Sequence, residues 1–536
     1  MIGRVGQSHC CYSKNTVCLR WLFCHRLTAI HFGSCIENLD MIKLLLVFLL
    51  GMLSVLGFAP FYLFPVPVIA LAVLLYFCHT SVMPRKAALL GFGFGMGLFS
   101  AGVTWLYVSL HDFGAMPMPI AIVALIVLCA YMSSFPAASL WLLARLRSAS
   151  PMLWAAAAGA LLMLSEWLRG YLFTGFPWLA LGYSQTPNSP LVGFAPILGV
   201  YGISFILIFS AAMLVFWFNS NFKTKRYVVM FCALWMGGFA LQAIDWVQPE
   251  GEPVTVSLLQ GNIAQDLKWR DDHLENNMET YARLILESKS RLIVTPEISI
   301  PLFSDVMPSA YLSHIAEHAR SHDGDVLIGL AERTVDGSDD YYNTMFSFGT
   351  APEQRYRKHH LVPFGEFIPL KPVFGWIIQV LHIPLSDFSR GDLRQQPMQL
   401  AGQHVAINIC YEDVFGEEII NQLPQATLLV NVSNDAWFGR SIGPQQHLQI
   451  SQMRALETGR YMLRATNTGV TAIIDERGQV RHSIEIFTTA ALHGVAQGFK
   501  GATPYVLAGN YPILGLAALA VVMASISAFR GRRKKR

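Results

Sequence analysis

Long apolar runs separated by short polar loops fill the first half of this 536-residue chain and return near its C-terminus. A helix needs about 20 mostly apolar residues to cross the roughly 30 Å hydrocarbon core of a bilayer. Eight runs approach that length, near residues 43–60, 64–80, 87–110, 117–143, 151–172, 191–218, 227–245 and 505–528. No single soluble domain could bury so many apolar helices, so the pattern predicts a helical membrane domain of about eight spans.

The distribution of Lys and Arg between these runs predicts the orientation of the chain. Short cytoplasmic loops of membrane proteins carry an excess of these residues. They collect at residues 85–86, 145–147, 223–226 and 530–536, whereas the loop 111–117 has neither. This alternation predicts that both termini are cytoplasmic and that the long region before the last run lies outside the cytoplasm.

From Pro253 onward the pattern changes to short runs rich in β-branched residues, which are typical of strands. The predicted strands cover residues 254–260, 291–295, 325–330, 404–409 and 426–432. Helical patterns separate some of them, at residues 274–289 and 310–321. Alternating strands and helices favour an α/β layered domain.

The composition also indicates two environments, lipid and water. The chain is 53% hydrophobic and 14% charged, whereas an ordinary soluble protein has about 25% charged residues. Much of the basic character behind the formal net charge of +4 lies in the C-terminal tail and the short loops. We therefore expect no nucleic-acid binding.

The first 40 residues follow neither pattern. They hold five of the nine cysteines, without the paired spacing of a zinc site. A short basic flank and an apolar run begin at Met41 instead. We expect residues 1–40 to be a disordered or non-native extension, and the alternative is a metal-binding cytoplasmic extension. The remaining predicted domains are a seven-helix membrane domain at 41–248, an α/β domain at 249–500, and a last span with a basic tail at 501–536.

Polar residues at the ends of predicted strands are candidates for catalysis. Glu297 follows one strand, Cys410 follows another, and Lys358 lies between them in the sequence. Because α/β folds tend to bind ligands at the carboxyl ends of strands, these three side chains form a candidate nucleophilic set. Each has an ordinary alternative: a buried apolar cysteine, a helix-capping glutamate and a solvated lysine. Cys410 is the only cysteine of the 249–500 region, so it has no disulfide partner there.

Glu166 and Arg169 stand near the end of an apolar run, shortly before the aromatic segment 175–178. Ionisable groups near a bilayer usually face protein or water. Two interpretations stay open for this segment. It either anchors the chain at the level of the lipid headgroups or shapes a site where lipid enters.

Three sequence phrases carry a resemblance to a known family. Thr-Pro-Glu ends at Glu297, Lys-x-x-Leu-Val-Pro-Phe-Gly-Glu covers residues 358–366, and Cys-Tyr-Glu covers residues 410–412. Their order resembles the nitrilase superfamily, and their wording is similar to the apolipoprotein N-acyltransferase family, which also joins such a domain to several membrane spans. Further matching segments are 260–262, 433–438 and 464–469. Thr295 departs from the Trp that is more usual there, which leaves the local packing open.

The resemblance implies a four-layer α-β-β-α domain and acyl transfer through a cysteine thioester, with no metal or cofactor. Cys410 would be the nucleophile, Glu297 the proton acceptor and Lys358 the group that stabilises the oxyanion. Supporting roles are implied for Glu366, Tyr411, Glu412, Trp269 and Trp437. The two glutamates would orient Lys358 or an incoming amine, or serve structure alone. The two tryptophans would face lipid or form a lid, or lie in the core.

The resemblance also implies the substrates and the location. The donor would be a membrane phospholipid, and the acceptor would be the N-terminal α-amino group of a diacylglyceryl-cysteine apolipoprotein. The protein would lie in a bacterial inner membrane with its catalytic domain in the periplasm. One alternative is a membrane-anchored amidase or nitrilase that passes the acyl group to water. Another is a transporter or receptor with an inactive domain, which the lack of evident repeat symmetry disfavours weakly.

Overall fold

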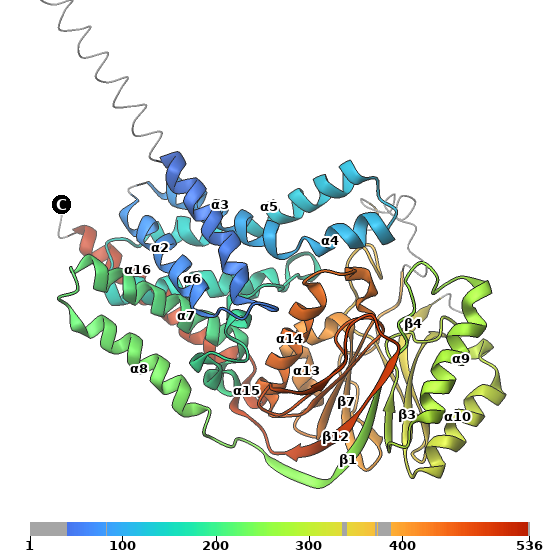
Figure 1. Cartoon of the computed structure of the whole chain (residues 1–536). Coiled ribbons are helices and arrows are strands. Elements are labelled where there is room, and N and C mark those ends of the chain that lie inside the picture. The colour runs from blue at the N-terminus through green and yellow to red at the C-terminus, as the bar shows by residue number, and fades with distance from the viewer. Residues whose placement is uncertain (1–39, 82, 335–339, 370–371, 373–386, 534–536) are drawn as a thin grey trace, which may run out of the picture.

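The computed structural model describes residues 40–533, apart from residues 82, 335–339, 370–371 and 373–386. Apolar helices form one side of the molecule and two β-sheets with flanking helices form the other (Figure 1). The predicted extension lies outside the described residues except for Asp40. What the sequence predicts for that segment therefore stays a prediction.

Each of the eight predicted apolar runs contains a helix. These are the helix Asp40–Gly57, α2 (Pro65–Thr80), α3 (Pro84–Gly102) with α4 (Trp105–Val108), α5 (Met118–Arg145), α6 (Pro151–Arg169), α7 (Ala195–Asn219), α8 (Lys225–Leu241) and α16 (Tyr511–Arg533). By length and composition, five helices among the described residues are able to cross a membrane. A sixth span results if α3 and the bent continuation Trp105–Phe113 are taken together.

The prediction of about eight spans is therefore not confirmed, because some runs contain residues that are not helical. Phe64, the first residue of the run 64–80, lies in a turn, so α2 has only 16 residues. The helix α8 ends at Leu241, four residues before the predicted end, and has 17 residues. A bend of 56° separates α3 from its continuation. An apolar run thus overestimates the length of a helix when its ends turn.

Close helix packing explains the glycine-rich sequence of α3. A Cβ on Gly97 would lie 1.9 Å from the carbonyl oxygen of Phe48 in the first helix. On Gly91 it would lie 2.5 Å from the carbonyl oxygen of Pro136 in α5. Small residues at such contacts let helix backbones approach closely, which is how helices associate in a membrane. These glycines therefore let α3 pack closely against both the first helix and α5.

The polar half of the chain contains two six-stranded sheets. The first has the order β12 (Ala490–Lys500), β1 (Gln248–Gln260), β2 (Leu292–Val294), β3 (Asp325–Arg333), β4 (Tyr341–Gly349) and β5 (Arg355–Arg357). The second has the order β11 (Val480–Ser483), β10 (Ala472–Ile474), β9 (Met462–Thr466), β8 (Leu428–Ser433), β7 (Gln403–Ile409) and β6 (Met398–Leu400). Strands β1 to β3 are parallel, as are β7 to β9, so several carboxyl ends meet at one edge of each sheet. At the opposite end of the domain, Gln248 of β1 pairs with Lys500 of β12.

The two sheets pack face to face and helices cover their outer faces, as the α-β-β-α expectation requires (Figure 1). Branched residues such as Val256, Ile407 and Val430 form the core between the sheets. The helices α9 (Asp271–Glu287) and α10 (Ser309–Ser321) cover the first sheet. The helix α14 (Gly443–Thr458) covers the second sheet and also packs against α7. This sandwich therefore shares one helical layer with the membrane helices.

Glu166 and Arg169 help to join the two parts. Glu166 accepts a hydrogen bond from the Leu181 backbone N–H at 3.0 Å, and Arg169 donates to the Trp178 carbonyl at 2.7 Å. Both side chains are buried in protein, so the interpretation as headgroup anchors does not fit. They hold the loop that carries Trp178 against α6, and Trp178 in turn contacts Gln446 of the sandwich. A role in lipid entry stays a prediction.

Gln446 of α14 is a central contact between the two parts. Its Oε1 accepts hydrogen bonds from the indole N–H groups of Trp105, at 3.2 Å, and Trp178, at 2.8 Å. Its Nε2 donates to the Gly102 carbonyl at 3.1 Å. All three side chains are buried. One side chain of the sandwich thus satisfies three buried groups of the helical part.

We expect Gln446→Ala to destabilise the protein strongly. A buried polar group that loses its partner costs about 1 kcal/mol or more, so the free energy of unfolding should fall by about 3 kcal/mol. Tryptophan fluorescence during denaturant unfolding in detergent measures this change. Gln399→Ala, at an exposed position of β6, is the matched control. A Gln446→Ala variant with the same free energy of unfolding as the wild type would show that Gln446 does not stabilise the contact between the two parts.

Candidate active site

Cys410 is the first residue after β7, at the edge of the second sheet. Alternating branched residues of β7 point into the core between the sheets and fix the direction of the strand. The Cys410 backbone has a φ of 54°, in the left-handed region, which costs roughly 1 kcal/mol or more for a residue with a Cβ. The chain then enters a short 3-10 helix, η7 (Cys410–Val414). This sharp turn presents the thiol at the strand end.

Glu297 and Lys358 form a buried ion pair. Glu297 follows β2 and Lys358 follows β5, so both come from the first sheet. The Lys358 Nζ donates to Glu297 Oε1 at 3.1 Å. Asn343 donates to the same oxygen at 2.7 Å, and the Asn434 backbone N–H donates to Oε2 at 3.0 Å. Glu297 is 6% exposed and Lys358 is 1% exposed, so water hardly screens the pair.

The electrostatics of this pair favour its charged form. Burial raises the pKa of the Glu297 carboxyl, but the charge and hydrogen bond of Lys358 outweigh it and hold that pKa below its ordinary value. Burial lowers the pKa of the Lys358 ammonium, but the carboxylates of Glu297 and Glu366 raise it well above its ordinary value. At neutral pH the site therefore contains a carboxylate that is able to accept a proton.

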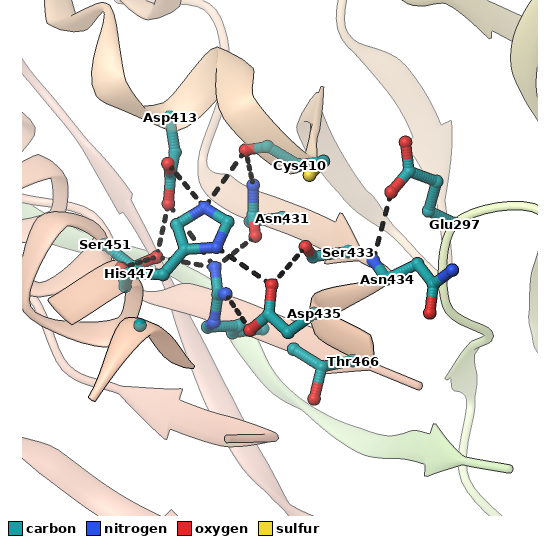
Figure 2. Close-up of polar contacts among 12 residues, drawn as sticks. Glu297, Cys410, Asp413, Asn431, Ser433, Asn434, Asp435, His447, Ser451 and Thr466 are labelled. Carbon is teal, nitrogen blue, oxygen red and sulfur yellow. Dashed lines mark hydrogen bonds and ion pairs between the residues drawn. The ribbon is translucent and has the colours of Figure 1, made fainter. Parts of the chain in front are cut away.

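The Cys410 thiol lies on the side of its strand end that faces Glu297 (Figure 2). Burial raises the pKa of this thiol well above its ordinary value, and the Glu297 charge adds to the effect. The Lys358 charge and a hydrogen bond with Ser433 act in the opposite direction without reversing it. The thiol is therefore protonated at rest, and it requires a base to become a nucleophile.

Glu366 extends the ion pair to a second carboxylate. Its Oε1 accepts from the Lys358 Nζ at 2.8 Å and from Asn343 at 3.2 Å. Its Oε2 accepts from the Val362 backbone N–H at 2.8 Å, which fixes the turn that carries it. Glu366 therefore contacts Lys358 directly, and its predicted supporting role stays a prediction.

Glu412 joins the two sheets at the site. Its Oε1 accepts from the backbone N–H groups of His359, at 2.7 Å, and His360, at 3.1 Å. Its Oε2 accepts from the Ile409 backbone N–H at 2.6 Å and from the Tyr356 hydroxyl at 3.1 Å. Burial raises the pKa of this carboxyl to about 7. Glu412 thus holds the segment after Lys358 against the residue before Cys410.

The three predicted aromatic residues lie in different places. Tyr411 is buried, and its hydroxyl donates to the Gly175 carbonyl at 3.0 Å, across the boundary with the helical part. Trp269 packs on a small apolar cluster that includes Ile298, next to the turn after β2. The Trp437 ring makes an edge-to-face contact with the Phe113 ring, at the end of the bent α3–α4 segment, and the two ring centroids are 6.0 Å apart. Trp269 and Trp437 thus pack against different parts of the structure, and their predicted lipid or lid roles stay predictions.

Lys268 is a second buried lysine at the site, and it is not among the residues predicted from the sequence. It is 3% exposed, and its Nζ donates to the Glu297 carbonyl oxygen at 3.3 Å. Burial lowers its pKa to about 8, although the charges of Glu297 and Cys410 act against this change. The only available signal was its position beside Trp269, which does not distinguish it from a surface lysine.

Asn343, Asn434 and a set of buried ionic side chains behind Cys410 were also missed. They lie far from the candidate residues in the sequence. Strand pairing brings them next to those residues in the fold. The described residues contain no group of three or more His, Cys, Asp or Glu side chains arranged to hold a metal ion. His359 and His360 make hydrogen bonds to Gly391 and Glu418, and His382 lies outside the described residues.

Comparisons with known proteins cover both parts of the chain. The family model of the apolipoprotein N-acyltransferase N-terminal domain matches residues 50–213, and the carbon-nitrogen hydrolase model matches residues 255–487. The apolipoprotein N-acyltransferase of Nitrosomonas europaea is 64% identical over 492 residues, which are 92% of this chain and 99% of the relative. That of Chromobacterium violaceum is 42% identical over 494 residues, which are 92% of this chain and 95% of the relative.

The long, apolar helices and the α-β-β-α sandwich agree with these matches. One family model matches the helical part and the other matches the sandwich, and each relative is matched over nearly its whole length. This chain therefore belongs to the apolipoprotein N-acyltransferase family, as a membrane-embedded bacterial acyltransferase with a nitrilase-like domain.

Proposed function

We propose that this protein transfers an acyl chain from a membrane phospholipid to the N-terminal α-amino group of a diacylglyceryl-cysteine lipoprotein, through a thioester on Cys410. The observation that carries this proposal is the buried Glu297–Lys358 ion pair beside a protonated thiol. A carboxylate that is ionised at neutral pH, next to a thiol at a strand end, supplies the base that a cysteine nucleophile needs.

The first step forms the thioester. Glu297 takes the proton of the Cys410 thiol, and the sulfur attacks the carbonyl carbon of a phospholipid ester. Lys358 and the backbone N–H of Tyr411 stabilise the negative charge that develops on the carbonyl oxygen. The ester C–O bond then breaks, and the leaving oxygen takes the proton from Glu297 to give a lysophospholipid.

The second step transfers the acyl group to nitrogen. The lipoprotein α-amino group attacks the thioester carbonyl and loses a proton to Glu297. The C–S bond breaks, the sulfur recovers the proton, and the product is an amide. Glu366 keeps Lys358 in position through both steps. Glu412 keeps the segment after Lys358 next to the turn that carries Cys410.

The location follows from the same proposal. The phospholipid would enter from an inner membrane crossed by the helices of 41–248 and 501–536. The catalytic region 249–500 would lie on the periplasmic side, with both termini in the cytoplasm. Supporting this orientation, Lys and Arg collect in alternate loops between the apolar runs and in the C-terminal tail. Trp437 and Trp269 would meet the lipid chains or form a lid.

We expect the wild-type protein to gain the mass of one acyl chain on Cys410 when it is incubated with phospholipid alone. Peptide mass spectrometry after digestion locates the adduct. Cys410→Ala should form no adduct and should lose activity by about 10³-fold or more. Cys232→Ala, which removes an exposed cysteine in α8, is the matched control and should be acylated normally. An unmodified Cys410 in active protein would overturn the thioester.

The acceptor separates this proposal from the amidase or nitrilase alternative. Protein is incubated with phospholipid that carries a labelled acyl chain and with a diacylated lipopeptide. We expect the label in an amide at the lipopeptide N-terminus, because the thioester is intercepted by the amine. Label that appears only as free fatty acid would instead show that water is the acceptor.

Lys268→Met should move the acidic side of the pH profile of thioester formation. The Lys268 charge helps to hold the pKa of Glu297 below its ordinary value, so the wild-type base stays ionised to low pH. Without that charge the pKa of Glu297 rises, and the rate should begin to fall at a higher pH. Single-turnover acylation between about pH 4 and pH 8 measures the shift.

The control for this experiment is Lys500→Met, which removes an exposed lysine paired with Glu250 at the far end of the sandwich. Its acidic limb should coincide with that of the wild type. A Lys268 variant whose acidic limb also coincides with the wild type would show that Lys268 does not influence the base.

A further inference from the structure

Four buried ionic side chains lie directly behind Cys410. They are Asp413 of η7, Asp435 of η9 (Asp435–Phe438), His447 of α14 and Arg464 of β9, and we call them the His447 cluster. Each side chain is at most 1% exposed. Figure 2 shows His447 between Asp413 and Asp435, on the side of Cys410 away from Glu297. The proposed reaction uses none of them.

The contacts of the His447 ring fix its protonation. Its Nδ1 lies 3.0 Å from Asp435 Oδ1, and its Nε2 lies 3.0 Å from Asp413 Oδ1. A carboxylate oxygen only accepts hydrogen bonds, so both ring nitrogens must carry a hydrogen. The ring is therefore an imidazolium. Arg464 pairs with both aspartates, at 3.4 and 2.9 Å, so two cations balance two anions.

The His447 cluster holds the backbone of the candidate nucleophile. The Cys410 carbonyl oxygen lies 3.3 Å from His447 Nε2 and accepts from Asn431 Nδ2 at 3.1 Å. Asn431 is in turn held by Arg464, which donates to its Oδ1. Both donors to this carbonyl are thus positioned by the same cluster. They stabilise a residue whose left-handed backbone would otherwise be unfavourable.

Fixing this carbonyl also fixes the group next to it. The peptide unit between Cys410 and Tyr411 is planar, and its C=O and N–H bonds point in opposite directions. With the carbonyl held on the His447 side, the Tyr411 N–H points away from the cluster. That N–H is one of the two donors proposed to stabilise the oxyanion.

We propose that His447 is a positioning residue for acyl transfer, which as an imidazolium holds the Cys410–Tyr411 peptide so that the thiol and the Tyr411 N–H meet the ester carbonyl together. The inference rests on the proposed role of Cys410 as the nucleophile. A purely structural cluster would stabilise the fold without altering the rate per folded molecule, and its titration would leave the pH profile unchanged.

His447→Gln tests the inference, because glutamine fills similar space without a charge. We expect the first-order rate of Cys410 acylation to fall by about 100-fold, the scale on which loss of one oxyanion donor acts, while the KM for phospholipid stays nearly unchanged. The matched control is His318→Gln. The His318 ring lies 2.7 Å from the Ser288 carbonyl, on α10 outside the first sheet, so its removal should leave the rate unchanged.

The pH profile supplies a readout that a structural role would not move. Burial and the Arg464 charge lower the pKa of His447, but Asp413 and Asp435 outweigh them and raise it to about 9. The stabilisation by the charged ring is thus complete below the ordinary pKa and is lost as the pH rises through about 9. On the remaining sides His447 meets the rings of Trp178 and Phe438.

In the wild type, the acylation rate should therefore decline through about pH 9, and this decline should be absent in His447→Gln. Asp413→Asn removes one facing charge and should move the decline to lower pH. Wild-type protein that forms no adduct on Cys410 would overturn the thioester proposal and this inference together. An adduct that forms in His447→Gln at the wild-type rate would overturn the inference alone. If His447→Gln does not fold, an Asp413→Asn profile identical to the wild type overturns it.

Discussion

A carboxylate buried away from water remains ionised only beside a compensating cation, and the arrangement of this site depends on that constraint. The Glu297–Lys358 pair lies at the edge of the first sheet, where the two residues follow different strands. Neither position would tolerate its charge alone. The strands between them, β3 and β4, must keep the two ends within hydrogen-bond distance, and β4 supplies Asn343 as a shared donor. The first sheet thus holds Glu297 and Lys358 close enough to form their ion pair.

The second sheet contributes a different element, a strained turn. Cys410 adopts a left-handed backbone because contacts on both sides hold it there. Glu412 binds the N–H of the residue before it, and the His447 cluster binds its own carbonyl. The first contact reaches across to the segment of Lys358, so the thiol and the ion pair are positioned by one set of hydrogen bonds. The two halves of the site are therefore mechanically coupled.

The sequence predicted those parts of the site that follow strands. Glu297 and Cys410 end runs of branched residues, and this local pattern places their side chains at sheet edges. Lys268 and Asn343 meet Glu297 only because distant segments come together, and no local pattern reports that. His447 was hidden for another reason. Its helix, α14, is rich in polar residues and would be expected at a surface, yet it is buried between the second sheet and the membrane helices. Its polar side chains are satisfied by both neighbours.

The apolar runs predicted the positions of the apolar helices, but not their lengths, since Phe64 and residues 242–245 lie within these runs and outside the helices. The pairing of β1 with β12 has a separate consequence for the whole chain. Gln248 and Lys500 are partners, so the sandwich begins and ends at strands about 5 Å apart. It is an insertion between α8 and the last helices, tethered to the bilayer by two adjacent strands of polypeptide. Because these two connections lie side by side, they act as a single attachment point, and the packing of α14 on α7 is what fixes the direction in which the active site faces.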